Sequence, residues 1–107
     1  MDLYNTLNNL LEDLQTSVKS LRTTATEYAE AYKNYRVLLA KKLTQLKAEG
    51  MAITLASDIA RGDEEIATAK MVEIKKEAIY KANMESINAI KLQIKVIENQ
   101  ITRELGV

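Results

Sequence analysis

The sequence predicts an all-α fold, a long antiparallel helical hairpin resembling a coiled coil, and three observations indicate it. The 107 residues include no proline and only three glycines, the two residue types that most disfavour helix interiors. Between residues 3 and 46 an apolar or aromatic residue returns every three or four positions, a mean of about 3.6, the period of an α-helix. A stripe of the same spacing follows between residues 69 and 105. Each of two long helices therefore has one apolar face, and the two faces are expected to pack together.

The ends of the first long helix can be read from local signals. Asp2 or Asn5 is expected to cap its N-terminus. No interruption follows before Gly50, which is expected to adopt the left-handed conformation that ends many helices, with Met51 folding back on Leu46. The chain is predicted to turn there.

A short bridging helix is expected at the tip of the hairpin, over residues 53–61. Thr54 is placed to cap it, and Leu55 and Ile59 lie on one side of it. Asp63 should then cap the second long helix, over about residues 64–104. Folding at this bridge would place Tyr32 near Tyr80. We expect residues 1–107 to form a single domain.

A further apolar row on the second helix exceeds what two helices can cover. It includes Met71, Ile74 and Ala78, which we predict to be a dimer surface, giving a homodimer in the form of a four-helix bundle. Lys76 and Asn83 interrupt the main stripe of the same helix. Polar residues at such positions commonly fix register or oligomeric state, and we predict that role for both.

The composition argues against an enzyme. Histidine and cysteine are absent, and with them the commonest general base, the thiol nucleophile and the usual transition-metal ligands. Carboxylates such as Glu73 and Glu77 are expected to form ion pairs on solvated helix faces, with a carboxylate–metal enzyme as the alternative. No glycine-rich phosphate loop occurs. We therefore expect a non-enzymatic protein without cofactor or metal.

Charge is balanced overall but unevenly distributed. Fifteen basic and fifteen acidic side chains cancel. Residues 1–32 carry five acids against two bases, a net charge of −3, whereas residues 33–47 carry five bases and no acid, a net charge of +5. The favoured interpretation of this basic segment is a solvated face or ion pairs with a partner subunit; the alternative is contact with nucleic acid phosphates. Its members are Lys33, Arg36, Lys41, Lys42 and Lys47.

No apolar run approaches the roughly 18 residues of a membrane span, and the first residues lack the basic and apolar regions of a signal peptide. We therefore expect a protein of the cytoplasm without membrane contact.

Several segments resemble small uncharacterised helical proteins that phages and prophages of Gram-positive bacteria encode. They are YRVLLAKK (35–42), LKAEGM (46–51), SDIARGDEE (57–65), LQI (92–94) and IENQITRE (97–104). The resemblance implies an accessory role in the host cytoplasm, in the setting of replication and recombination genes. The expected function is thus a phage accessory protein that acts through protein–protein contacts, and the alternative is a nucleic-acid-associated recombination or replication factor.

Overall fold

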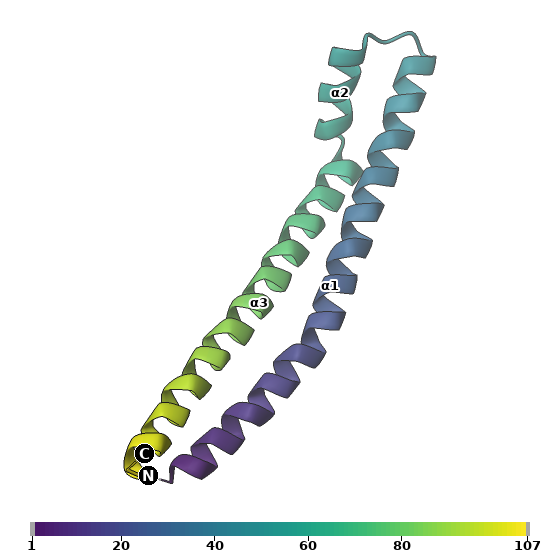
Figure 1. Ribbon diagram of the computed structural model, residues 1–107. Coiled ribbons are helices and arrows are strands. Elements are labelled where there is room, and N and C mark those ends of the chain that lie inside the picture. The colour runs from purple at the N-terminus through teal and green to yellow at the C-terminus, as the bar shows by residue number, and fades with distance from the viewer. Residues whose placement is uncertain (1, 107) are drawn as a thin grey trace. The chain divides into compact units, whose positions relative to one another are not determined.

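A computed structural model describes residues 2–106. It contains the helices α1 (Leu3–Ala48), α2 (Ile53–Gly62) and α3 (Glu64–Glu104) and, over those residues, no strand (Figure 1). The all-helical prediction is confirmed. Contacts divide the chain into two compact units, which we call the terminal unit (residues 2–24 and 80–106) and the central unit (residues 25–79). Both long helices contribute to each unit.

The predicted ends of α1 are confirmed. Asp2 caps its N-terminus, because the carboxylate Oδ1 accepts hydrogen bonds from the backbone N–H groups of Tyr4 at 2.9 Å and Asn5 at 3.3 Å. At the other end Gly50 has φ +85°. The Met51 N–H donates to the Leu46 carbonyl at 3.1 Å, and the Gly50 N–H donates to the Lys47 carbonyl at 3.0 Å. These two bonds form a Schellman motif.

Asp63 separates α2 from α3 and serves both. Its N–H donates to the Ala60 carbonyl at 3.2 Å, and its carboxylate accepts from the N–H groups of Glu65 at 3.1 Å and Ile66 at 3.4 Å. The predicted cap of α3 is therefore confirmed. The predicted cap of α2 is wrong: Ala52 occupies that position without a side-chain bond, and Thr54 lies inside the first turn.

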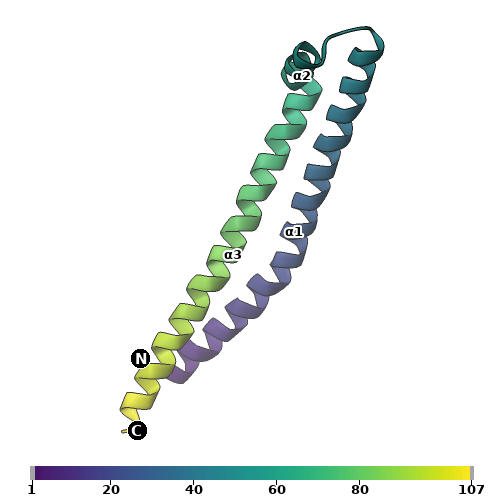
Figure 2. The ribbon, with the colours of Figure 1, turned by 45° about the horizontal axis from the view of Figure 1, so that its top comes forward.

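The core of the central unit joins all three helices. Leu39 and Leu46 of α1 pack with Ala56 and Ala60 of α2 and with Ile66 of α3. Both alanines are 0% exposed, so α2 lies closely beside the end of α1, as Figures 1 and 2 show. Leu55 and Ile59, predicted to lie on one side of α2, are both exposed, and Ala56 and Ala60 form the packed side of the helix.

Chain reversal takes place before α2, at residues 49–52, and not across it. Lys42 Nζ consequently lies 3.7 Å from Asp63 Oδ2, although the register predicted from a bridging helix would bring it near residue 70. Within the central unit α3 runs antiparallel to α1, since Glu27, further toward the N-terminus, pairs with Lys76. The residues of α2 thus already belong to the returning arm.

Partly or fully buried positions on α1 and α3 return alternately after three and four residues. This spacing averages about 3.5, the heptad spacing of helices that pack side by side, whereas the sequence analysis took a mean of about 3.6. Five side chains assigned to the apolar stripes are exposed: Val18, Tyr32, Val72, Ile79 and, beyond the end of α3, Leu105. In the terminal unit the covered positions that follow this spacing are Leu3, Leu7, Leu10, Leu14, Ser17, Leu21 and Thr24 on α1, with Tyr80, Asn83, Ile87, Ile90, Ile94, Ile97 and Ile101 on α3.

Candidate interaction surfaces and polar contacts

The predicted basic segment does not form one face. Lys33, Arg36, Lys41 and Lys47 are exposed, whereas Lys42 is half-buried and paired with Asp63. Lys33 and Lys42 are nine residues apart, which is two and a half helical turns, so they point to opposite sides of α1. Four cations of the segment are left at the surface.

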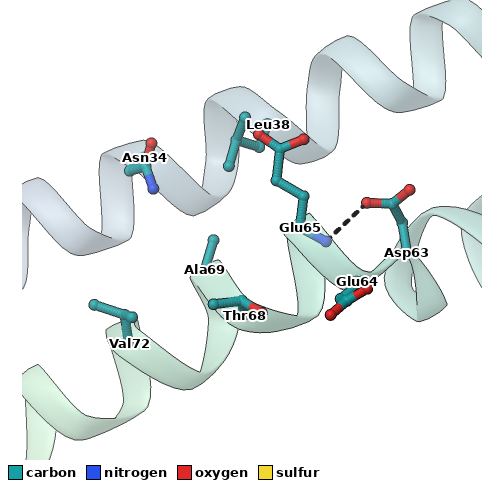
Figure 3. A pocket seen from close by; sticks show the side chains of 8 residues that line it. All are labelled: Asn34, Leu38, Asp63, Glu64, Glu65, Thr68, Ala69 and Val72. Atoms are coloured by element: carbon teal, nitrogen blue, oxygen red, sulfur yellow. Dashed lines mark hydrogen bonds between the residues drawn. The ribbon is translucent and has the colours of Figure 1, made fainter.

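An open groove lies between α1 and the start of α3 in the central unit (Figure 3). Asn34 and Leu38 line it from α1, and three carboxylates, Asp63, Glu64 and Glu65, stand near the first turn of α3. The Asp63 carboxylate is already engaged as a cap and with Lys42. Within residues 2–106 no three side chains of the histidine, cysteine or carboxylate types are placed so that they could hold a metal ion together.

Two polar contacts join the long helices within the central unit. The Tyr28 hydroxyl donates to Glu77 Oε2 at 2.8 Å, and Lys76 Nζ donates to Glu27 Oε2 at 3.0 Å. Lys76, predicted to determine register, therefore faces α1 and has a specific partner there. The bond to Glu77 raises the pKa of the Tyr28 phenol, because a carboxylate acceptor favours the protonated phenol.

Stability should fall above about pH 10 as a consequence of these contacts. A folded-state pKa raised above the ordinary tyrosine value of about 10 contributes stability that is complete below that value and is lost as pH rises through the raised pKa. Glu73 likewise raises the pKa of Lys70, so the contribution of Lys70 to stability is also lost as pH rises. Thermal unfolding of the parent chain and of Tyr28→Phe, followed by circular dichroism between about pH 8 and 11, should show a smaller alkaline loss in the variant. An equal loss in both would contradict the assignment to Tyr28.

Glu73 is a carboxylate buried between the helices. It is 5% exposed, and its Oε2 lies 2.7 Å from Lys70 Nζ. Besides this ion pair, no donor within residues 2–106 contacts that oxygen. The same Lys70 ammonium lies 4.7 Å from the centre of the Tyr35 ring, within the range of a cation–π contact. Lys70 thus compensates the buried charge while half of its own side chain stays in solvent.

Asn83 is the central polar contact of the terminal unit. Its Oδ1 accepts from the Thr24 hydroxyl at 2.9 Å, and its Nδ2 donates to the Ser17 carbonyl at 3.0 Å. One side chain on α3 thereby contacts two turns of α1. Such a contact is satisfied in one register and broken when the helices slide by a turn.

Replacing Asn83 with leucine should raise stability and relax register. The larger apolar side chain fits a covered position, so we expect a gain of about 1 kcal/mol in the free energy of unfolding. Sedimentation velocity should meanwhile show a broader set of association states than in the parent chain. Asn88→Leu, at an exposed position of the same helix, is the control. A single association state unchanged from the parent would count against the register role.

The predicted dimer surface is solvent-exposed. Met71 and Ile74 are 47% and 57% exposed, and Ala78 is exposed as well. A second apolar area lies in the terminal unit, where Leu10, Leu92, Val96 and Ile97 form most of the lining of an open groove. Both units therefore present apolar side chains that nothing in the described chain covers.

The burial of Glu73 and the contacts that Glu27 and Glu77 make with the facing helix were not predicted from the sequence. A usable signal was present. Counting back in sevens from Ile87, a buried residue, reaches Tyr80 and then Glu73, so strict heptad numbering would have assigned this carboxylate to the covered seam.

Comparison with protein-family models, with curated proteins and with solved structures found no match. Among residues 2–106, no helix contains an apolar stretch long enough to cross a membrane.

Proposed function

We propose that the chain is a non-enzymatic interaction protein, a helical hairpin that self-associates and acts through protein–protein contacts. The observation that carries this proposal is the exposed apolar surface of both units, which includes Ile74 and Leu92. Antiparallel contacts within each unit support the hairpin. The resemblance to small phage and prophage proteins supports a role as a phage accessory protein in the host cytoplasm.

Exposed apolar side chains support self-association. In the terminal unit Leu92 and Val96 are 65% and 49% exposed. The apolar groove of the terminal unit, bordered by Leu92 and Val96, is the surface we propose for a second copy.

Analytical ultracentrifugation at micromolar concentration tests this proposal. A dimer is expected, and Leu92→Glu should shift it toward monomer because the charge would be buried in the interface. Leu105→Glu, a matched change at an exposed leucine at the end of α3, is the control. A parent chain that sediments strictly as a monomer would refute self-association.

Nucleic acid binding is the second candidate, favoured by the four exposed cations Lys33, Arg36, Lys41 and Lys47. Phosphate contacts would make binding weaken steeply with salt. Lys41→Glu combined with Lys47→Glu should then abolish binding to labelled DNA, whereas Lys91→Glu, in the terminal unit, should not. Binding that does not respond to salt or to these variants would refute the candidate.

A further inference from the structure

The exposed face of α3 in the terminal unit has a row of residues at heptad spacing, which we call the outer row. Its members are four and three residues apart in turn, and all are exposed: Glu85, Ala89, Leu92, Val96, Asn99 and Arg103. Each member follows a covered position of α3 by two residues, which is about 200° around the helix. The outer row therefore lies mostly on the side away from α1, where its spacing suits packing against one further helix.

The chemistry of the outer row is arranged evenly about Ile94. Leu92 and Val96 lie two residues to either side of Ile94, and Glu85 and Arg103 lie nine residues to either side. The apolar residues thus form the middle of the row, with one acid at one end and one base at the other. Within residues 2–106 neither the Glu85 carboxylate nor the Arg103 guanidinium has an ion-pair partner. Both charges are therefore available to a second chain.

Two copies of the outer row are complementary when they run antiparallel. In a two-fold pairing centred at Ile94, residues equally far from Ile94 on its two sides face each other. Leu92 of each copy then meets Val96 of the other. Glu85 of each copy meets Arg103 of the other, and this contact occurs twice because a two-fold interface repeats every interaction.

Other pairings of two outer rows lose this complementarity. A parallel pairing would bring Glu85 to Glu85 and Arg103 to Arg103. An antiparallel pairing that slips by one heptad would set Glu85 against Val96, or Arg103 against Leu92. Like charges placed together, or charges covered without a partner, disfavour these arrangements. The charges of the row thus select one direction and one register.

The edges of the outer row carry little further charge. One edge has only uncharged side chains: Ser86, Gln93 and Gln100. On the other edge Lys95 is the single charged residue between positions 85 and 103. The two-fold pairing brings the Lys95 residues of the two copies near each other, but both are exposed. Their ammonium groups can separate into solvent, so the repulsion is weak, and the two acid–base contacts dominate the charge pattern.

We propose that the chain dimerises through the outer row, paired antiparallel with the same row of a second copy about a two-fold axis at Ile94. Leu92 and Val96, which also line the groove of the terminal unit, form the apolar centre of this contact. The two ion pairs between Glu85 and Arg103 set its direction and register, as charges do in coiled coils. The inference rests on the proposed self-association and specifies its geometry.

Charge reversals test the pairing by sedimentation equilibrium of the full chain. Glu85→Arg and Arg103→Glu should each weaken dimerisation roughly tenfold, because each variant places like charges together at both ends of the contact. A mixture of the two variants should recover dimerisation, since both contacts in the mixed dimer again join opposite charges. Glu98→Arg, at an exposed position of α3 outside the row, is the matched control. No recovery in the mixture, or equal weakening by Glu98→Arg, would overturn the proposal.

Introduced cysteines test the direction of the pairing. The chain has no cysteine of its own, so Ala89→Cys and Asn99→Cys each carry a single thiol. A mixture of the two variants should form the mixed disulfide on oxidation. Each variant alone should not, because identical positions are then ten residues of helix apart, about 15 Å, and a disulfide needs Cα atoms within about 7 Å. Disulfides within either variant alone, or a dimer without the mixed disulfide, would overturn the antiparallel pairing.

The parent chain and Ile74→Ser separate this inference from the proposed function. Ile74 belongs to the row of the central unit that the sequence predicts as the dimer surface, and its replacement should leave dimerisation unchanged. A parent chain that dimerises, but loses the dimer with Ile74→Ser or fails the tests above, would overturn the pairing through the outer row and leave self-association standing. A parent chain that is strictly monomeric at micromolar concentration would refute both.

Discussion

Replacing Leu46 with alanine is expected to lower the free energy of unfolding by about 3 kcal/mol, the largest effect of any single change considered for this chain. Leu46 is 5% exposed and packs with Ala56 and Ala60 where α1 and α2 meet. Truncation removes buried methyl groups and leaves a cavity that the two alanines cannot fill. At fixed protein concentration the Tm should fall by at least roughly 10 °C.

Leu55→Ala is the matched control for that prediction. Leu55 lies on α2 of the same unit and is 54% exposed, so the same chemical change should alter stability by less than about 0.5 kcal/mol. Chemical denaturation of the parent and both variants, with equal m-values required for the comparison, measures the difference. Equal losses in the two variants would contradict the packing of α2 against α1 through its alanines.

Helix ends were predictable from the sequence because their signals are local. Gly50 has the positive φ that a Schellman ending needs, and Asp2 and Asp63 each supply an oxygen to N–H groups two or three residues ahead. The failure at Thr54 has a local cause too. The chain enters α2 in an extended conformation at Ala52, so the helix begins before threonine could act as a cap.

Register was not predictable in the same way, because average hydrophobic spacing distinguishes poorly between periods of about 3.6 and 3.5. The two periods diverge by about 20° per heptad. A stripe drawn through apolar residues alone therefore includes Val18, although the covered position is its neighbour Ser17. Ser17 and Thr24 are covered positions although their side chains are polar. A search by hydrophobicity passes over such residues, although the Thr24 hydroxyl and the Ser17 backbone carbonyl both bond Asn83 on the facing helix.

The packed side of α2 was not predicted from the sequence, for a different physical reason. Leu55 and Ile59 offer more apolar area than Ala56 and Ala60, yet the two alanines are the buried pair. Small residues instead allow the backbones of α1 and α2 to approach closely, with Leu39 and Leu46 supplying the volume. Which side of α2 becomes buried depends on the shape of the facing helix, and a local sequence pattern does not describe that shape.

Glu73→Leu is expected to raise the free energy of unfolding by about 1–2 kcal/mol, because a buried charge with a single, half-exposed partner costs more in lost hydration than its ion pair returns. Leucine has a similar volume and suits a seam position beside Ala69 and the α1 side chains. Lys70 would lose its partner but keeps 47% of its side chain in solvent, so its ammonium remains hydrated. Thermal and urea unfolding measure the gain, and Glu98→Leu, at an exposed position of the same helix, should show little change.

Removing the cation of this ion pair instead of the carboxylate should lower the free energy of unfolding. Lys70→Met leaves the Glu73 carboxylate buried without its cation, and removing one member of such a pair is more damaging than replacing the buried member. We therefore expect a lower Tm for Lys70→Met, and recovery of that loss when Glu73→Leu is added. If Glu73→Leu instead destabilises the chain, the carboxylate must contribute net stability to this seam. A stabilised Glu73→Leu variant that also associates less uniformly would mean that the buried charge is retained for pairing specificity at the expense of stability, the role predicted for Asn83.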